Sequence, residues 1–299
     1  MNLLLFALTV MIWGSSWIAI AMQVGPVPVL VSVFYRFGLA ALIYLALLAA
    51  MGRLRLPSRR DQIWIAAQAL CLFSLNFLCF YSAASYIPSG LMSVVFSLAS
   101  IFNALNARLF FGDAISRRTV LAVALGAGGL ALLFGGDLAH AEAADTLRGL
   151  ALAAMGTMFF SLGNMVSRRN SAAGLPPSIA SAWGMGYGAL VLLGLIALTG
   201  TPVVLPPDAR YMGALLYLSL LGSVVGFTTY LLLVARIGSS RAAYTTVLFP
   251  IIALTISTIF EGYVWHWTGL VGLALALLGN VVMFARPLRL SRAERAARH

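Results

Sequence analysis

The sequence is poor in charge and contains no lysine. Only 9% of its 299 residues are charged, and the 19 basic residues are all arginine. Soluble domains carry about 25% charged residues, so a chain that is 62% hydrophobic is predicted to be an integral membrane protein. A net charge of +11 could suggest a nucleic-acid partner, but the arginines lie in short segments between apolar runs. This is the positive-inside pattern of a bacterial inner-membrane protein, so we expect no nucleic-acid partner.

Cysteine and histidine are also scarce. Cys71 and Cys79 lie eight residues apart in one apolar run, which is about 12 Å along a helix and too far for a disulfide. The three histidines, His140, His266 and His299, fall near loops or the end of the chain. No metal-ligand spacing is present, so we expect neither a metal nor a cofactor.

Ten apolar runs make up most of the chain. A helix needs about 20 apolar residues, at 1.5 Å rise per residue, to cross a bilayer. The runs are placed at residues 3–22, 29–51, 62–84, 88–110, 117–136, 148–168, 177–199, 211–234, 241–261 and 267–286. The predicted fold class is therefore all-α and integral to the membrane, with ten transmembrane helices. The first run is expected to be a helix rather than a signal peptide, because no arginine precedes it.

Charge in the connecting segments alternates from one side of the membrane to the other. The segments that follow or border the even-numbered runs carry most of the arginines, at Arg53, Arg55, Arg59, Arg60, Arg108, Arg117, Arg118, Arg168, Arg169, Arg236, Arg241 and in the tail from Arg286. The other segments carry Asp137, Glu142, Asp145, Asp208 and Glu261 against only Arg148 and Arg210. The positive-inside rule then places both termini in the cytoplasm.

The second half of the chain resembles the first at a fixed offset of 149 residues. The matching pairs are Gly14 with Gly163, Pro28 with Pro177, Ser32 with Ser181, Ser74 with Ser223, Tyr81 with Tyr230, Phe111 with Phe260, and Thr119 with Thr268. Each half holds five spans, and an odd number inverts the second copy in the membrane. We predict repeats at 1–136 and 148–286, a periplasmic linker at 137–147 and a basic cytoplasmic tail at 287–299. The alternative is chance matching among common apolar residues.

The stretch from Arg241 to Gly262 carries the strongest local signal. It has no charge between Arg241 and Glu261, and Pro250 lies near its middle. Proline removes one backbone hydrogen bond, so we expect a kink there, and a broken helix at bilayer depth usually lines a cavity. The hydroxyls of Tyr244, Thr245 and Thr246 and the ring of Phe249, just before the proline, would then face a small amphipathic solute. The alternative is a packing kink in which the hydroxyls bond to their own helix.

Four segments carry a family resemblance: Trp13-Gly14-Ser15-Ser16-Trp17, Tyr35-Arg36-Phe37, Ser100 through Gly112-Asp113, and Arg241 through Phe249-Pro250 to Phe260-Glu261-Gly262. With these segments the chain resembles the drug/metabolite transporter superfamily, specifically its ten-helix EamA-type exporters. The resemblance covers both halves and implies that helices one, three, four, six, eight and nine surround a substrate path. One departure is Ser100, which stands where the family usually has proline, so no proline kinks the first half.

Uncharged polar and aromatic side chains within the helices are the candidates for substrate binding. They are Trp13, Ser16, Trp17, Asn76, Tyr81, Ser93, Phe96, Ser97, Asn164, Tyr230, Tyr244, Thr245 and Phe249. Trp13, Ser16 and Trp17 share one helical face. The repeat pairs Ser15 with Asn164 and Tyr81 with Tyr230 across a central cavity. For each residue taken alone, the alternative is an interhelical hydrogen bond worth about 0.6 kcal/mol.

Arg36 and Glu261 are the candidates for a structural or coupling role. Arg36 lies about two turns into its helix, where it could bind a substrate carboxylate. The favoured interpretation is that Arg36 serves folding, either by snorkelling to the interface or by pairing with Glu261, which lies toward the same side. Arg108 is expected to anchor its helix end or to pair with Asp113.

No Asp, Glu or His lies well inside any of the ten runs. The sequence therefore shows no intramembrane proton relay and no carboxylate cage for sodium. We expect transport down the gradient of the substrate, with any coupled proton carried by the substrate or by a residue near the rim such as Glu261.

Helices five and ten are rich in glycine and almost free of polar groups. Gly126, Gly128 and Gly129 lie in the fifth, and Gly269 and Gly272 in the tenth. Small residues let helices approach closely, so these two helices are expected to be scaffold or a homodimer contact.

The sequence thus indicates an inner-membrane exporter of small neutral or zwitterionic metabolites. Amino acids are the leading substrate class, because the chain is similar to the aromatic amino acid exporters of this family. Drug-like cations, purines or a lipid-linked sugar are the alternative substrates. A membrane-embedded enzyme acting on lipid is the alternative from another class, but it would need a nucleophile, an acid/base pair or a metal cluster at the membrane rim, and none is visible.

Overall fold

The computed structural model describes residues 2–136, 143–237 and 245–284, and every regular element in these ranges is a helix. The first half contains α1 (Asn2–Ala21), α2 (Val29–Ala50), α3 (Arg59–Ala69), the π-helical η1 (Leu70–Leu75), α4 (Asn76–Ala83), α5 (Ser89–Ser97), α6 (Ala99–Phe111) and α7 (Arg117–Phe134). The second contains α8 (Ala143–Ala172), α9 (Pro177–Thr199), α10 (Ala209–Leu216), the π-helical η3 (Tyr217–Val225), α11 (Gly226–Ile237), α13 (Thr245–Phe260) and α14 (Trp267–Phe284).

These helices confirm the predicted all-α membrane fold. Eight helices are long and apolar enough to cross a bilayer, and the segments Thr245–Phe260 and Trp267–Met283 are shorter apolar helices. All ten predicted runs coincide with them, with α3, η1 and α4 forming one span and α10, η3 and α11 another. The largest difference is α8, which has 30 residues rather than the predicted span 148–168. Part of the predicted linker, from Ala143, is therefore helical, whereas the predicted tail at 287–299 lies outside the described residues.

The third and eighth spans are interrupted by π-helix at matching places. Adding 149 to the bounds of η1 gives residues 219–224, which fall within η3. In each segment a serine hydroxyl donates to the carbonyl five residues earlier, from Ser74 to Ala69 at 3.3 Å and from Ser223 to Leu218 at 2.9 Å. Ser74 and Ser223 are themselves one of the sequence pairs, so the local conformation follows the repeat.

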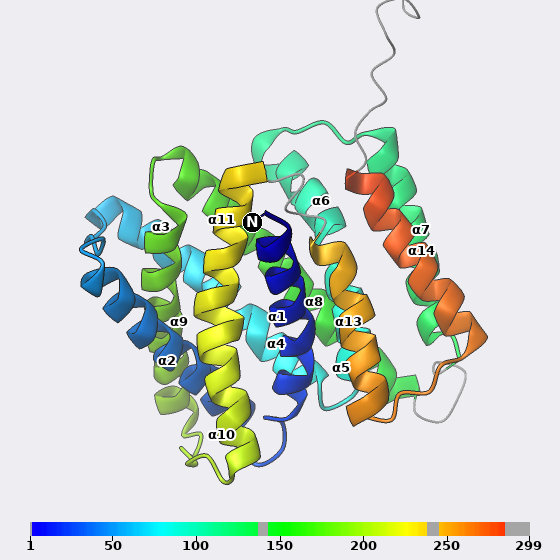
Figure 1. Ribbon diagram of the computed structural model, residues 1–299, viewed down its shortest axis with the longest axis horizontal. Helices are drawn as coiled ribbons and strands as arrows, with labels where there is room; N and C mark the ends of the chain where they lie inside the picture. The colour runs from blue at the N-terminus through cyan, green and yellow to red at the C-terminus, as the bar shows by residue number, and fades with distance from the viewer. Residues whose placement is uncertain (1, 137–142, 238–244, 285–299) are drawn as a thin grey trace, which may run out of the picture.

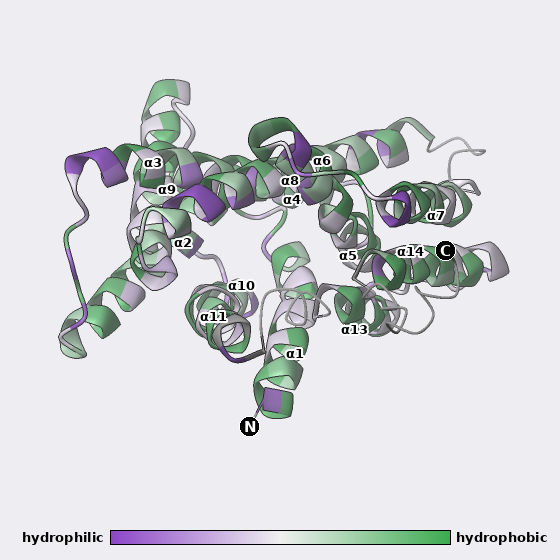
Figure 2. Cartoon of the chain, turned by 90° about the horizontal axis from the view of Figure 1, so that it is seen from above, coloured by the Kyte–Doolittle hydropathy of each residue, from purple (hydrophilic) through white to green (hydrophobic). Residues whose placement is uncertain are grey.

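The packing of the helices is exchanged between the two halves. Helix α1 packs on α11 and α13, while its counterpart α8 packs on α4, α5 and α6. Three further large contacts join a span to its counterpart in the other half: α5 to α13, α2 to α9 and α7 to α14. Figure 2 shows α2, α3 and α9 at one end of the molecule and the α7 and α14 pair at the other. Between these ends, α4 and α8 lie on one side and α1, α11 and α13 on the other. Each side of the molecule therefore combines helices from both sequence halves, and the two sides follow the same plan.

The glycines of α7 and α14 face each other within one chain. A Cβ at Gly129 would lie 2.6 Å from the carbonyl oxygen of Gly272, and a Cβ at Gly272 would lie 2.6 Å from that of Gly129. The backbones of α7 and α14 thus touch where these side chains are absent. Gly129 and Gly272 therefore serve the scaffold contact that was one of the two expectations, whereas nothing lies within 4 Å of a Cβ at Gly128.

The break in the fourth span occurs without proline. Helix α5 ends at Ser97 and α6 begins at Ala99, with Leu98 between them at φ −76° and ψ 2°. The N–H of Leu98 donates to Val95, three residues earlier, and its carbonyl accepts from Ile101, so the chain makes a tight turn here. Ser100 accordingly leaves no proline at this place, and the interruption at Leu98 arises from the turn instead. In the other half α13 is assigned as one helix that includes Pro250.

One end of the molecule gathers the ends of helices that meet the arginine-rich segments. Helices α2 and α6 end there, and α3 and α7 begin there at Arg59 and Arg117. Ser58 and Ser116 cap these two starts through backbone N–H groups three residues on. We call this the arginine-rich end, and Figure 1 shows the N-terminus, the start of α7 and the end of α6 on the same upper side.

Candidate functional site

A cavity of about 540 Å³ lies between the two halves. The deepest part of the cavity reaches Ile20 and Phe80, close to the ends of α1 and α4 that lie away from the arginine-rich end. The part of the cavity nearest the arginine-rich end is lined by residues from the last or first turns of their helices: Ala107, Arg168, Pro177, Thr246 and Met283. The side chain of Arg168 is 48% exposed, so the cavity opens to solvent at this end.

Trp13 is the centre of an aromatic cluster on one wall. Its ring lies 5.4 Å from that of Phe227, 5.1 Å from Tyr230 and 5.6 Å from Phe249. Its Nε1 donates to the carbonyl of Gly222 at 3.1 Å, which fixes the ring in place. This wall joins α1 to α11 and α13.

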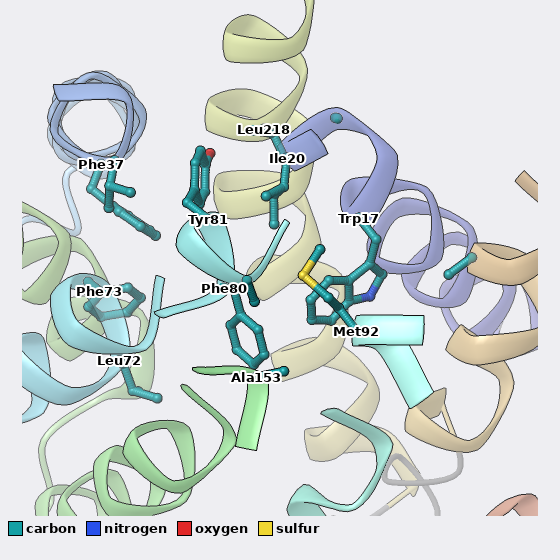
Figure 3. Packing of buried hydrophobic residues seen from close by; sticks show 14 of the residues in the cluster. Trp17, Ile20, Phe37, Leu72, Phe73, Phe80, Tyr81, Met92, Ala153 and Leu218 are labelled. Atoms are coloured by element: carbon teal, nitrogen blue, oxygen red, sulfur yellow. The ribbon is translucent and has the colours of Figure 1, made fainter. Parts of the chain in front are cut away.

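A second aromatic cluster begins one turn further along α1 and joins it to α4, α5 and α8. Trp17 lies 5.1 Å from Phe80 and 5.4 Å from Phe96, and Phe96 lies 4.7 Å from Phe160. Figure 3 shows Trp17 and Phe80 turned toward each other beside Met92. Edge-to-face aromatic pairs add about 0.5–1.5 kcal/mol beyond the area that they bury, so both walls are expected to be firm surfaces for an apolar group.

Asn164, Asn76 and Arg36 are three of the polar residues in the mostly apolar lining. Asn164 donates to Asn103 at 3.3 Å across the cavity wall between α8 and α6. Asn76 uses its Nδ2 to donate to the carbonyl of Gly156 at 3.2 Å, while its Oδ1 has no hydrogen-bond partner in the described chain. The guanidinium of Arg36 lies over the ring of Phe77, with Cζ 4.3 Å from the centroid.

The structure brings together most of the predicted substrate-binding residues. The cavity is lined by Trp13, Ser16, Trp17, Asn76, Phe96, Asn164, Tyr230 and Phe249. Four others lie behind the wall, because Tyr81, Ser93, Ser97 and Thr245 are buried and are not among the lining residues. The hydroxyl of Tyr81 donates to Gln23 at 2.7 Å, and Ser93 and Ser97 donate to carbonyls of their own helix. Tyr244 lies outside the described residues.

Sequence reasoning missed several lining residues. They are chiefly Gln68, Phe77, Phe80, Asn103, Phe160, Phe227 and Thr246. Helical spacing contained part of the signal, since Phe80 lies four residues after Asn76 and Phe227 three before Tyr230. Ser15, which the repeat places opposite Asn164, instead contacts the hydroxyl of Tyr217 at 2.6 Å and does not line the cavity.

The predicted ion pair between Arg36 and Glu261 does not form. The carboxylate of Glu261 accepts from the N–H of Ser89 at 3.1 Å, from its hydroxyl at 2.6 Å and from the hydroxyl of Ser257 at 2.6 Å. Ser89 is the first residue of α5, so this anion lies at the positive end of a helix, which replaces an arginine as its partner. Gly90 permits the approach, because a Cβ there would lie 2.9 Å from the Cα of Leu254.

The predicted pair of Arg108 with Asp113 is also wrong. Asp113 forms a two-bond salt bridge with Arg168, at 2.6 and 3.3 Å, and Arg108 donates to the carbonyl of Gly112. The hydrogen bond from Arg168 holds the pKa of the Asp113 carboxyl below its usual value of 3.8. The folded-state pKa is depressed, so the bridge is intact at neutral pH and is lost only as pH falls through that lowered value.

We therefore expect Asp113→Asn to leave the pH profile of transport unchanged between pH 5 and 8. Asp113 is fully ionised over that range, and an exposed ion pair contributes little to stability. Initial transport rates and the thermal midpoint of the purified variant should match wild type. If the transport rate of the variant depends on pH more weakly or more steeply than that of wild type, this carboxyl takes part in proton movement.

Comparison with known proteins identifies the family. Residues 1–135 and 147–285 each match the model of the EamA-like transporter family. The chain belongs to this family. YedA, an uncharacterized inner membrane transporter of Escherichia coli (strain K12), is 27% identical over 95% of this chain and 92% of its own length. A probable terminal-alkyne amino-acid exporter of Streptantibioticus cattleyicolor is 25% identical over 94% of this chain and 92% of its own length.

A solved structure shares the fold. A crystal structure superposes with a TM-score of 0.67 at 19% identity, covering 94% of this chain and 95% of that one. The family match and the named relatives make the chain a multi-pass membrane transporter of the drug/metabolite type.

Proposed function

We propose that the protein exports small zwitterionic metabolites, amino acids foremost, across the bacterial inner membrane. The observation that carries the proposal is the cavity between the two halves, which has aromatic walls, few polar groups and one open end. A cavity of about 540 Å³ suits a solute of amino-acid size. The relative named as a probable amino-acid exporter supports the same class.

The proposed mechanism is alternating access. We assign the arginine-rich end and both termini to the cytoplasm by the positive-inside rule, so this conformation faces inward. The other end is held closed where Glu261 binds the start of α5. Two inverted halves of one plan can exchange conformations, which would open the outer end and close the inner one.

The charge of the cavity favours zwitterions over drug-like cations. Arg36 and Arg168 are the charged residues that line it within the described chain, and no described acidic side chain does so. A cation would meet repulsion there, whereas a carboxylate would not. The uptake experiment below tests a purine and a cation beside the amino acids.

We propose transport without catalysis and without a dedicated proton site. The lining residues of the described chain include no histidine, cysteine or carboxylate to serve as nucleophile or acid. A homodimer through α7 and α14 would have to use their outer faces, because their glycines already face each other.

Uptake into proteoliposomes tests the proposal. The purified chain would be reconstituted and offered radiolabelled amino acids, a purine and a lipophilic cation, with and without an imposed proton gradient. We expect protein-dependent uptake of aromatic or other neutral amino acids to an end level that the gradient does not change. If only the purine or the cation enters, the assignment is wrong, and accumulation that follows the gradient would contradict passive transport.

Trp13→Ala is expected to raise the KM for an aromatic amino acid about 10-fold, because one aromatic wall loses its central ring. The matched control is Trp267→Ala, since that tryptophan is 78% exposed and distant from the lining residues. Concentration series in the same proteoliposomes give both constants. Equal effects of the two substitutions would mean that the Trp13 cluster does not contact substrate.

A further inference from the structure

We infer that Arg36 and Asn76 together bind the two charged groups common to α-amino acids. Arg36 would donate to the carboxylate, and the side-chain oxygen of Asn76 would accept from the ammonium group. The inference rests on the proposed function and deepens it, because it names the substrate groups that the cavity recognises. It also predicts that both groups are required.

Arg36 is a buried cation with two unpaired donor atoms. Its side chain lines the cavity, the residue is 3% exposed, and Nε and Nη1 have no hydrogen-bond partner in the described chain. Its aromatic neighbours Phe77 and Phe37, at 4.3 and 5.1 Å from Cζ, stabilise the charge but accept no N–H hydrogen bond in the plane of the guanidinium. A buried charge with open donors is costly, and a carboxylate bound to the planar fork would compensate it.

Asn76 supplies the complementary acceptor. It is 1% exposed, and Nδ2 donates to the carbonyl of Gly156, which fixes the orientation of the amide. Its Oδ1 is thereby the free atom, and it is without a partner among the described residues although the side chain lines the cavity. A carbonyl oxygen can accept from an ammonium group and cannot donate to a carboxylate, so the polarity of the two sites is opposite.

Arg36 and Asn76 line the same cavity and come from helices that contact each other, α2 and α4. The guanidinium stacks on Phe77, the residue after Asn76, so α2 presents its cation beside the start of α4. The rings of Trp17 and Phe80 continue the wall from there, and Phe80 is one helical turn beyond Asn76. An amino acid bound by its charged groups between α2 and α4 would place its side chain against these rings.

The same groups argue against other anions. A phosphate dianion needs more than one free cation, and the second arginine of the lining, Arg168, is already bound to Asp113. A simple amine lacks the group that would compensate Arg36. The chemistry therefore matches one carboxylate with a neighbouring hydrogen-bond donor.

A series of analogues tests the inference on the unmodified protein. Proteoliposomes containing the full chain would take up labelled L-phenylalanine in competition with phenylalaninamide, phenethylamine and 3-phenylpropanoate. The first two lack the carboxylate and should compete about 10- to 100-fold less well than unlabelled L-phenylalanine. The third lacks the ammonium group and should compete about 10-fold less well, because a neutral acceptor contributes less than a charged partner.

Variants assign each preference to its residue. In Arg36→Met the preference for phenylalanine over its amide should disappear, and in Arg36→Lys it should partly return. In Asn76→Ala the preference over 3-phenylpropanoate should disappear while the preference over the amide remains. A role in packing alone would weaken all ligands equally, so these ratios separate recognition from folding.

If the wild type takes phenylalanine and phenylalaninamide equally well, the inference is overturned and amino-acid transport stands. If none of the four compounds binds or moves, the inference falls together with the proposed function. If an Arg36 variant does not fold, the wild-type series and Asn76→Ala decide the question.

Discussion

Gly129→Leu is expected to abolish most of the folded protein. A Cβ at this position would lie 2.6 Å from the carbonyl oxygen of Gly272 and 2.8 Å from the backbone N of Ala276. Both are backbone atoms, so α7 and α14 would have to separate along the most extensive helix–helix contact of the described residues. Overpacking commonly costs 1–3 kcal/mol, and we expect about 3 kcal/mol here because no side chain can move aside.

Gly128→Leu is the matched control for this substitution. It makes the same change one residue away in the same helix, where nothing lies within 4 Å of a Cβ. Both substitutions raise the helix propensity by the same amount, so a difference in stability between the two variants reports the contact of α7 with α14. Yield of monodisperse protein and its thermal midpoint in detergent give the comparison. Equal stability of the two variants would show that α7 and α14 do not pack in this way.

Glu261→Ala is expected to open the outer end of the transporter. The substitution removes the acceptor of the Ser89 N–H and hydroxyl and of the Ser257 hydroxyl. Hydrogen bonds to a charged group contribute about 1.5–3 kcal/mol each, so losing three of them should shift the equilibrium away from the inward-facing state by at least about 1,000-fold. Helix α5 would also lose the anion at its start.

Cysteine labelling from outside measures this shift. Ser16→Cys places a thiol on the cavity wall, in a background where Cys71 and Cys79 are replaced by alanine. Its reaction with a membrane-impermeant maleimide added outside should be slow in the parent and much faster with Glu261→Ala. Ser257→Ala removes only one of the donors and should have a smaller effect. Unchanged labelling in Glu261→Ala would mean that this cluster does not hold the outer end closed.

The spans and their repeat were predictable because lipid imposes them. Each spanning helix must satisfy its own backbone and present apolar side chains, so hydropathy alone located all ten. A constant offset of 149 then indicated duplication, and the matching π-helical segments with Ser74 and Ser223 follow the same offset. The predicted domain bounds stay predictions, since only the family matches at 1–135 and 147–285 bear on them.

The partners of individual side chains could not be predicted in the same way. Arg36 and Glu261 lie toward the same side in the sequence pattern, yet Glu261 is bound by the N-terminus of a helix, a partner that carries no charged residue. Tyr81 is one helical turn from Phe77, which lines the cavity, but its hydroxyl binds Gln23 from the loop after α1. Such contacts depend on how helices of the two halves pack, which periodicity within one helix does not contain.

A structure of the full chain with saturating L-phenylalanine present would test the central claim most directly. The account predicts one molecule in the cavity, with its carboxylate on Arg36, its ammonium group on the side-chain oxygen of Asn76 and its ring beside Trp17. An empty cavity, or phenylalanine bound instead in the shallow hollow beside Tyr217 and Met22, would contradict it.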